Sequence, residues 1–432
     1  MSHNAGCLKK QSIIFCFLFI TCSPTNKQFQ TSKGFSKKLT VFQTWVKTEI
    51  SKLQIPAVKI VMADFRGNKP HIQKIEVGPS TTQPFSVASI TKTLTALAIL
   101  KQVEKGNLAL DAKVSDILPG FHGARKELHS EPIRIRHLLS HTSGLAPGLG
   151  LRKQVIAGKE MNIPVQIWPT GTRYFYANIN YHLLARILEK ITNTPYARFM
   201  NHYILPKLNM KHSYFIPTAT GASGLMTTVQ DLTTYMHFWI NRNHPFAISD
   251  DLWQEMLSPV QEPPPIPAGI YRSLTWQVEF FQQNKVYSYS HEGRWYRVLC
   301  LLKIYPEKKF GFIFTSQPEA PFGFAYVQFR QQLEEKLTEL SSSFLAETNP
   351  LVPYFAQKPG ILLEEYPGYY KSFSGNRLFV RYANQNLYLG EEKLIPIHSS
   401  VFYSEKLGNV EFLFRQTQVY AMATRFHFWI KE

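Results

Sequence analysis

A serine and a lysine, Ser89 and Lys92, lie three residues apart in a stretch of the chain that is otherwise largely apolar. Three residues is close to one helical turn, so on a helix both side chains would project from the same face within contact distance. A serine hydroxyl is a weak nucleophile until a base removes its proton, and a lysine amine can act as that base once burial and nearby cations lower its pKa. The pair therefore predicts acyl transfer, with Ser89 as the nucleophile and Lys92 as its base.

The residues around Lys92 favour this chemistry over a chance pairing. A serine and a lysine at this spacing occur easily in a chain of 432 residues, most often as a helix cap and a solvent-facing charge. Residues 94–100 are almost all apolar, however, so a buried ammonium at position 92 would be costly without a function. A helix that begins at Ser89 would also direct unpaired backbone N–H groups toward an oxyanion formed there.

Several segments in the right order resemble the serine β-lactamase and penicillin-binding-protein superfamily, in particular its class C-like branch. They are the segment from Ser89 to Lys92, the stretches 110–119 and 135–145 after the nucleophile helix, and residues 224–232. The resemblance covers residues 42–315. It implies that Ser89 and Lys92 are the nucleophile motif of such an enzyme.

The second motif of that superfamily, Tyr-x-Asn, is matched by Tyr176-Ala177-Asn178. The resemblance implies that Tyr176 shares the proton transfers with Lys92, and that Asn178 orients the lysine and the amide of the substrate. A tyrosine can do this only if a nearby cation lowers its pKa, and Lys92 would be such a cation. Outside the motif, Tyr176 would be interpreted as a core residue.

The third motif, commonly Lys-Thr-Gly on an edge strand, has His291-Glu292-Gly293 as its counterpart. The resemblance implies that Gly293 permits close approach of the substrate, and that the backbone N–H of Arg294 completes the oxyanion hole. A histidine in the first position resembles esterase-like and D-amino-peptidase-like members more than strong antibiotic hydrolases. Loss of the lysine charge weakens the hold on a substrate carboxylate, which Arg294 or Arg297 could restore.

One segment departs from the superfamily pattern. Relatives often carry Gly-x-Gly-Trp before the third motif, and residues 273–276 read Ser-Leu-Thr-Trp. The aromatic residue is kept and both glycines are absent. The shape of the cleft near this segment therefore stays open.

Other catalytic patterns are not supported. His137 and His141 lie four residues apart and could face one metal, yet Leu138 stands where a zinc protease has its glutamate, and no third ligand is evident. We interpret both histidines as structural. Residues 221–225 are not a G-x-S-x-G elbow, because Leu225 occupies the last position. The predicted chemistry needs no metal and no organic cofactor.

The order of predicted elements sets the fold class. Helices are predicted at residues 42–53, 89–104, 181–191 and 326–340, and strands at 57–65, 72–77, 287–289, 298–304 and 310–315. Strands, then helices, then strands indicate an α+β domain, here residues 23–345. It would have the β-lactamase/transpeptidase-like form, an antiparallel sheet flanked by helices plus an all-helical lobe. Residues 346–362 are predicted to be a linker, and residues 363–432, with strands expected at 368–373, 377–383, 387–389, 401–403, 411–415 and 419–429, a small all-β domain.

The N-terminus has the layout of a secretory signal. Lys9 and Lys10 precede an apolar run at residues 12–20 that is too short to span a bilayer comfortably. We predict residues 1–22 to be a signal peptide and the mature protein to be exported, to the periplasm or the cell envelope. Cys22 stands where a lipoprotein signal would be cut and lipidated, although residues 19–21 match that pattern poorly. Membrane association through the N-terminus therefore stays an open alternative.

Composition narrows the range of partners. The 48 Lys and Arg against 30 Asp and Glu give a net charge of +18, which favours encounter with anionic partners. No zinc-finger spacing, RNP-type motif or run of five basic residues accompanies this charge, so we expect a solvated basic surface and no nucleic-acid partner. Cys300, the one cysteine far from the N-terminus, lies in an apolar stretch and is expected to be a buried structural thiol.

Two hypotheses for function follow. The first is an exported serine hydrolase that forms an acyl-enzyme with an ester, amide or D-amino peptide carbonyl, from a small-molecule or peptide substrate that could derive from the cell wall. The second is a catalytically silent, penicillin-binding-like envelope protein that binds peptide or cell-wall ligands. The four residues Ser89, Lys92, Tyr176 and Asn178 favour the enzyme, whereas the altered third motif and the missing glycines favour the silent protein.

Overall fold

The computed structural model describes residues 33–345 and 366–431. Short gaps in this description lie at residues 79–82, 123–130, 146–150, 157, 261–269, 282–284, 296–297, 317–323, 373–376, 397–400, 405–407, 416–417 and 425–427. The predicted signal peptide and linker lie outside the described residues, so both stay predictions.

In the sequence, most helices of the described chain fall between the first two strands of the large sheet and its later strands. They are α1 (Lys33–Lys52), α2 (Thr91–Glu104), α3 (Val114–Ile117), α4 (Ile135–Leu139), α5 (Asn178–Thr192), α6 (Tyr196–Phe199), α7 (Val229–Ile240), α8 (Asp250–Leu257) and α9 (Phe324–Phe344). Short turns of tighter or wider helix are η1 (Ala88–Ile90), η3 (Met200–Ile204) and η4 (Pro206–Leu208).

The strands form two large and two small sheets. Those before the linker region are β1 (Val58–Asp64), β2 (His71–Val77), β3 (Phe85–Ser86), β4 (Leu151–Ile156), β5 (Lys159–Pro164), β6 (Tyr214–Phe215), β7 (Leu225–Thr227), β8 (Ile270–Arg272), β9 (Gln277–Phe281), β10 (Lys285–Trp295), β11 (Val298–Tyr305) and β12 (Phe310–Ser316). Those after it are β13 (Gly368–Ser372), β14 (Arg377–Ala383), β15 (Asn386–Leu389), β16 (Glu392–Lys393), β17 (Ile395–Pro396), β18 (Val401–Ser404), β19 (Gly408–Arg415), β20 (Gln418–Thr424) and β21 (Phe428–Lys431).

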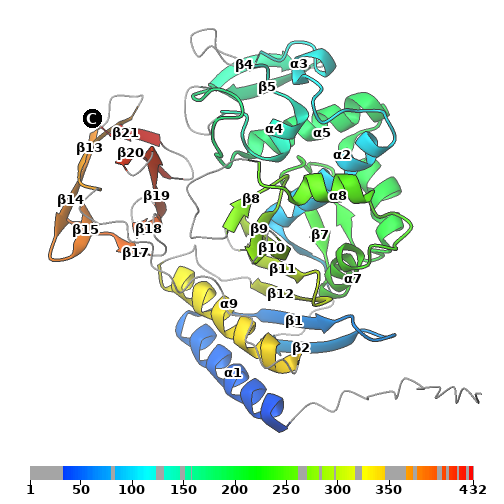
Figure 1. The fold of residues 1–432 in the computed structure, drawn as a ribbon, viewed down its shortest axis with the longest axis vertical. Coiled ribbons are helices and arrows are strands. Elements are labelled where there is room, and N and C mark those ends of the chain that lie inside the picture. Colours follow the sequence, from blue (N-terminus) through cyan, green and yellow to red (C-terminus); the bar gives the residue numbers. More distant parts are fainter. Residues whose placement is uncertain are drawn as a thin grey trace, which may run out of the picture.

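The large sheet of the first domain is antiparallel, in the order β2-β1-β12-β11-β10-β9-β8. Its central strands β11 and β12 are buried at nearly every position, because helices cover both faces. Figure 1 shows α1 and α9 side by side against one face, where Val46, Leu337 and Phe312 belong to one apolar core. Helix α7 packs on the other face, against β1, β11 and β12. The sheet therefore joins sequence segments that are more than 200 residues apart.

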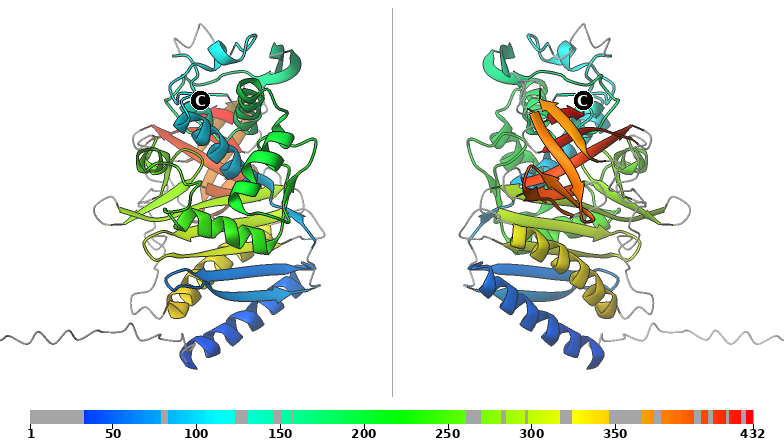
Figure 2. Two further views of the ribbon diagram at one scale, coloured as in Figure 1. Left: turned by 90° about the vertical axis from the view of Figure 1, so that its right-hand side faces the viewer. Right: turned by 90° about the vertical axis from the view of Figure 1, so that its left-hand side faces the viewer.

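Helix α2 lies at the centre of the second core. All its residues from Thr91 to Gln102 are buried. This explains why its sequence has no polar face, since a helix that is apolar all round must be surrounded by protein. Figure 2 shows the lobe that contains α2, α4 and α5 from two further sides. The sequence predicted an all-helical lobe, but β4 and β5 form a hairpin in it.

The C-terminal residues form a nine-stranded antiparallel sheet with an apolar core of its own. Tyr366 packs edge-on against Phe402 and Phe412 in this core. The predicted single strand at residues 419–429 is two strands, β20 and β21, which pair with each other. The α+β class with a small C-terminal β domain is thus confirmed, whereas the proposed limits of the domains stay predictions.

Cys300 is buried and not part of a disulfide, as predicted. None of the helices in the described part of the chain is both long and apolar enough to cross a membrane.

Candidate active site

Ser89 lies in the turn η1, which leads directly into α2. The turn is closed by a hydrogen bond from the Ile90 N–H to the Val87 carbonyl oxygen, at 3.1 Å. Ala88, just before the serine, has a φ of 46°, in the left-handed region that residues with a Cβ seldom adopt. Such strain is often retained at functional positions. It places Ser89, whose residue surface is 8% exposed, at the start of the buried helix.

Lys92 reaches back along α2 to the serine, as the three-residue spacing predicts. Its Nζ donates to Ser89 Oγ at 3.0 Å and to the Ala222 carbonyl oxygen at 2.9 Å. The side chain is fully buried. Two aromatic rings also face the amine, with the Tyr176 ring centre at 5.0 Å and the Tyr181 ring centre at 5.6 Å. The structure therefore brings the predicted nucleophile, base and tyrosine together.

Asn178 is the first residue of α5, two residues after Tyr176. Its carboxamide oxygen Oδ1 is buried and accepts no hydrogen bond from any described residue. A buried acceptor without a donor is costly, typically by about 1–3 kcal/mol. An N–H group of a bound ligand would relieve that cost, in keeping with the role in substrate binding that the sequence predicts for Asn178.

The third motif lies on β10 at the point where the strand loses one of its neighbours. Strand β10 pairs with β11 as far as Trp295, but with β9 only as far as Ser290. Among the described strands, none pairs with the other edge of residues 291–295. A Cβ added to Gly293 would lie 2.0 Å from the Val87 carbonyl oxygen. Only glycine allows this contact, which holds β10 against the turn that carries Ser89.

His291 differs chemically from the lysine that usually begins the third motif. Its Nδ1 lies 2.7 Å from the Glu292 carbonyl oxygen, and since a carbonyl can only accept, Nδ1 carries the proton. Burial and the charge of Lys92 lower the pKa of His291 to about 3, so the ring is neutral near pH 7. Nε2 therefore has a free lone pair. His291 presents a hydrogen-bond acceptor where a lysine would present a charged donor.

A cation near the third motif was not predicted. Arg272 ends β8, and its Nη1 donates to Gln277 Oε1 at 2.8 Å, while its guanidinium carbon lies 5.0 Å from the centre of the Tyr174 ring. Its charge adds to the burial and the Lys92 charge that lower the pKa of His291. Of the two arginines considered from sequence, Arg294 is half-buried on β10, and Arg297 lies outside the described residues. No motif in the sequence singles out Arg272.

The segment that lacks the family glycines keeps a glycine-like backbone. Thr275 has a φ of 80°, which is exceptional for a β-branched residue. Its N–H donates to the Leu139 carbonyl oxygen at 3.1 Å, and its Oγ1 lies 2.6 Å from the Tyr181 hydroxyl. Hydrogen bonds thus hold the shape that a glycine would adopt freely.

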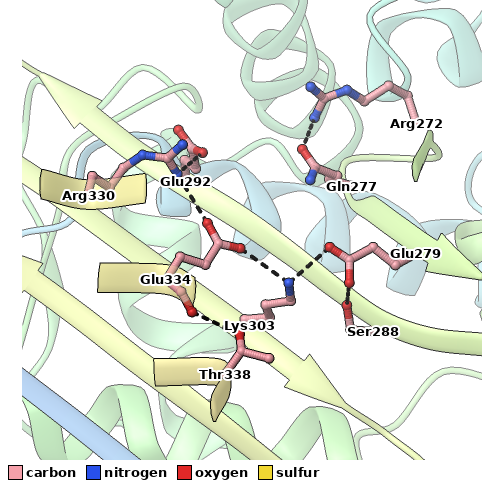
Figure 3. A network of polar contacts seen from close by, with 9 residues as sticks. All are labelled: Arg272, Gln277, Glu279, Ser288, Glu292, Lys303, Arg330, Glu334 and Thr338. Atoms are coloured by element: carbon pink, nitrogen blue, oxygen red, sulfur yellow. Dashed lines mark hydrogen bonds and ion pairs between the residues drawn. The ribbon is translucent and has the colours of Figure 1, made fainter. Parts of the chain in front are cut away.

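A network of charged side chains lies behind the third-motif strand, on the face that α9 covers (Figure 3). Arg330 of α9 contacts the Glu292 carboxylate, and Glu334 lies 3.5 Å from Arg330 and 3.2 Å from Lys303. Lys303 also bonds Glu279 at 2.9 Å. Burial alone would lower the pKa of Lys303, but Glu279, Tyr305 and Glu334 raise it well above its usual value. These side chains tie β10 to α9 directly behind His291.

His137 and His141, which were considered as ligands of one metal, lie in different surroundings. His137 lines a cavity of about 240 Å³ together with Arg136, Ser140 and Glu255, whereas the His141 ring packs against Tyr176. No group of three potential ligands is found among the described residues. Sequence reasoning treated His141 only as a possible ligand or a core residue, and missed its contact with the second motif.

Comparisons with known proteins identify the family of the chain. The Beta-lactamase family profile matches residues 50–335. The protein flp of Staphylococcus aureus (strain MW2) is 31% identical over 159 residues, which make up 34% of this chain and 30% of that protein. The chain thus spans about a third of the length of the curated relatives it matches.

Solved structures extend the likeness of the fold. The octameric penicillin-binding protein homologue from Pyrococcus abyssi has a TM-score of 0.59 at 21% identity, covering 91% of this chain and 100% of that one. A class C β-lactamase has a TM-score of 0.55 at 17% identity, covering 74% and 98%. The superfamily predicted from the three motifs is confirmed, and since the family profile matches well over half of the sequence, the chain belongs to the Beta-lactamase family.

Proposed function

We propose that this chain is an exported serine hydrolase that acts through an acyl-enzyme on Ser89, with an ester, amide or D-amino peptide as substrate. The observation that carries the proposal is the 3.0 Å contact between Lys92 Nζ and Ser89 Oγ, made by a lysine that is fully buried. The same amine also contacts the Ala222 carbonyl oxygen and the rings of Tyr176 and Tyr181. Membership of the Beta-lactamase family supports the same class of reaction.

The reaction would begin with attack of Ser89 Oγ on the substrate carbonyl carbon. The hydroxyl proton passes to the neutral amine of Lys92, and the negative charge moves to the carbonyl oxygen, where the backbone N–H groups of Ser89 and Arg294 bind it. Lys92 and Tyr176 then return the proton to the leaving oxygen or nitrogen. A water molecule attacks the resulting ester in the same way, and Ser89 regains its proton.

The edge of β10 would hold the substrate. Among the described strands, none continues the pairing of β9 along residues 291–295 of β10, so backbone N–H and C=O groups on this side would meet an extended substrate segment. Asn178 Oδ1 would accept from a substrate N–H, and His291 Nε2 from a second donor. His291 supplies no lysine charge at the third motif. The arrangement therefore favours ester and small peptide substrates over substrates that would be held chiefly by such a lysine.

Covalent labelling tests the proposal. The mature chain is treated with a fluorophosphonate and, separately, with a β-lactam, and the adduct is located by peptide mass spectrometry. We expect an adduct on Ser89 that Ser89→Ala abolishes. The matched control is Lys101→Met on the same helix, since Lys101 pairs with Glu104 away from the serine and should not affect labelling. A folded chain that no acylating probe labels would instead support the silent binding protein.

Export is proposed on the N-terminal layout alone. Lys9, Lys10 and the apolar run at residues 12–20 precede the proposed cleavage site at Cys22. Mass spectrometry of the N-terminus of the protein isolated from its own cells tests this. A terminus near residue 23 supports a cleaved signal, a diacylated Cys22 supports a lipid anchor, and an intact residue 1 in the cytoplasmic fraction contradicts export.

A further inference from the structure

His141 is a buried imidazole next to the proposed active site that the reaction above does not use. It is 4% exposed. Its ring centre lies 4.4 Å from that of Tyr176 and 5.1 Å from that of Tyr181, with tilts of 31° and 35°. Both tyrosine rings also face the amine of Lys92. His141 therefore packs on the same aromatic pair that surrounds the proposed base.

The same residue holds the backbone on both sides of Tyr176. The His141 carbonyl oxygen accepts from the Phe175 N–H at 2.8 Å, and its Nδ1 accepts from the Ala177 N–H at 3.1 Å. One hydrogen bond precedes the tyrosine and the other follows it. Together with the ring contact, they give three attachments from a single residue to the segment that carries the phenol.

The contacts also fix the proton on the imidazole. Ser143 Oγ donates to Asn180 Oδ1 at 2.7 Å, which orients the Asn180 amide so that its Nδ2 faces His141 Nδ1 at 3.2 Å. Nδ1 thus accepts from Ala177 and Asn180, and the proton is on Nε2. Nε2 is buried and has no hydrogen-bond partner among the described residues. The neutral Nε2–H form is the one that fits these donors.

The backbone of His141 is strained. Its φ is 58°, a left-handed conformation that costs roughly 1 kcal/mol or more at a residue with a Cβ. Glycine would adopt this conformation without strain, and asparagine would tolerate it better. Neither offers an aromatic ring to Tyr176. The position therefore carries an imidazole at a cost in local stability, which favours a role for the ring itself.

We propose that His141 is a positioning residue for Tyr176: it holds the phenol beside Lys92 through the hydrogen bonds that flank the tyrosine and through ring contact. The inference rests on the proposed function, since it assigns Tyr176 a part in proton transfer. His141 does not itself touch the substrate in this scheme. Its effect is on the rate of acylation through the placement of the tyrosine.

The surroundings of the ring keep it neutral over the working pH range. The charged and titratable groups that act on it are Lys92 of α2, His291 of β10 and Arg272 of β8, and the rings of Tyr174, Tyr176 and Tyr181 pack against it. Burial, followed by these three cationic or titratable groups, lowers the pKa of His141 well below its usual value. Protonation would place a hydrogen on Nδ1 and break the bond from the Ala177 N–H.

The test compares His141→Gly and His141→Asn with His137→Asn. His137 is a matched control because its Nδ1 also accepts a backbone N–H, that of Arg134, and because it lines a cavity whose lining does not include Ser89. We measure the rate of Ser89 acylation by a fluorophosphonate, kcat and KM with an activated ester, the pH profile of acylation, and the thermal unfolding temperature. The His137→Asn control should be acylated at the wild-type rate.

We expect acylation by His141→Gly to slow at least 30-fold with KM changed less than threefold, since a displacement of about 1 Å at a catalytic group can cost on the order of 100-fold. Its unfolding temperature should stay near that of the wild type, because the glycine relieves the strained φ. His141→Asn should recover part of the rate, because its Oδ1 can accept from Ala177. The pH profile of acylation should shift in both variants, because the proposed proton transfers need Tyr176 to be held beside Lys92.

Three outcomes would overturn the inference. A folded His141→Gly that acylates at the wild-type rate with an unchanged pH profile shows that Tyr176 needs no such support. Loss of folding in both variants shows that His141 supports the domain as a whole. Equal slowing in His137→Asn shows that the effect is not specific to this contact. A wild-type protein that no probe labels contradicts the proposed function itself, a result distinct from all three.

Discussion

Two lysines of this chain are buried to nearly the same degree and contact different kinds of oxygen atom. Lys92 is fully buried on α2, and its hydrogen bonds to Ser89 Oγ and the Ala222 carbonyl are to neutral oxygens. Lys303 is 1% exposed on β11, and its amine lies between the carboxylates of Glu279 and Glu334. Burial disfavours the charge of both, and two carboxylates at hydrogen-bond distance compensate the charge of Lys303.

The difference separates a lysine suited to chemistry from one suited to structure. Two carboxylates at hydrogen-bond distance keep Lys303 protonated, with its pKa well above the usual value. The two acceptors of Lys92, a hydroxyl oxygen and a backbone carbonyl oxygen, carry no formal charge. Lys303 joins β11 to β9 and α9, whereas Lys92 contacts the proposed nucleophile.

Removal of Lys92 should have the largest effect. In Lys92→Met we expect acylation of Ser89 to fall by about 10³-fold or more, because the hydroxyl loses its base. The free energy of unfolding should change little or rise, since the methionine fills the space without a buried amine. Labelling kinetics and urea unfolding check both parts. Acylation within tenfold of the wild type would mean that Tyr176 alone is the base.

Removal of Lys303 should have the opposite pattern. In Lys303→Met the carboxylates of Glu279 and Glu334 lose the cation between them, and Arg330 stays beside Glu334; this should lower the free energy of unfolding by about 3–5 kcal/mol. The triple variant with Glu279→Gln and Glu334→Gln should recover much of that loss. Urea unfolding at pH 7 measures both. An unchanged midpoint for Lys303→Met would show that water enters this network freely.

Acid should destabilise the first domain through its buried histidines. Burial first, with Lys92 next, lowers the pKa of His291 to about 3 and that of His141 well below 6.5. The unfolded chain binds these protons below about pH 6.5 and the folded chain does not, so stability is complete above that pH and falls as the pH drops toward the folded values.

Between pH 7 and pH 5 the expected loss is about 2 kcal/mol for each of these two histidines. Urea unfolding across this range measures the slope. His291→Asn should remove part of it, while a variant of the exposed His202 should leave it unchanged. A flat profile would mean that the imidazoles become charged without unfolding.

The smallest effect is expected at the Arg330–Glu292 pair, which joins α9 to β10. The Glu292 side chain is 46% exposed, so the pair adds little to stability. In Arg330→Gln we expect kcat/KM to fall about threefold to tenfold, mainly through KM, because β10 is held less firmly behind His291. Arg330→Lys should restore part of it. A wild-type KM in the glutamine variant would show that the pairing with β11 holds the strand without α9.

The parts of the site that local spacing governs could be predicted from sequence. Ser89 and Lys92 meet because the helix brings residues three apart together, and Tyr176 was found through its motif. Glu279, Lys303 and Glu334 were not selected, because they lie on three separate elements and their pairing depends on how α9 packs on the sheet. Such packing leaves no short-range pattern in the sequence.

Three further features depended on the backbone. The hairpin β4–β5 was missed, although Gly158 at its turn was an available signal. His141 and Thr275 take left-handed conformations that residue type argues against. Arg272 approaches the third motif from the edge strand β8, and only the strand order of the sheet places it there.

Cys300 gives the protein a built-in reporter of motion in the sheet. It lies opposite Gly293 on the neighbouring strand, with its sulfur 4.0 Å from the Ser86 carbonyl oxygen, and burial raises its pKa to about 12. A thiol in this state reacts with alkylating reagents only when the strand separates from the nucleophile turn. The rate at which Cys300 is alkylated, followed by mass spectrometry, therefore counts how often the site opens, without any label being introduced.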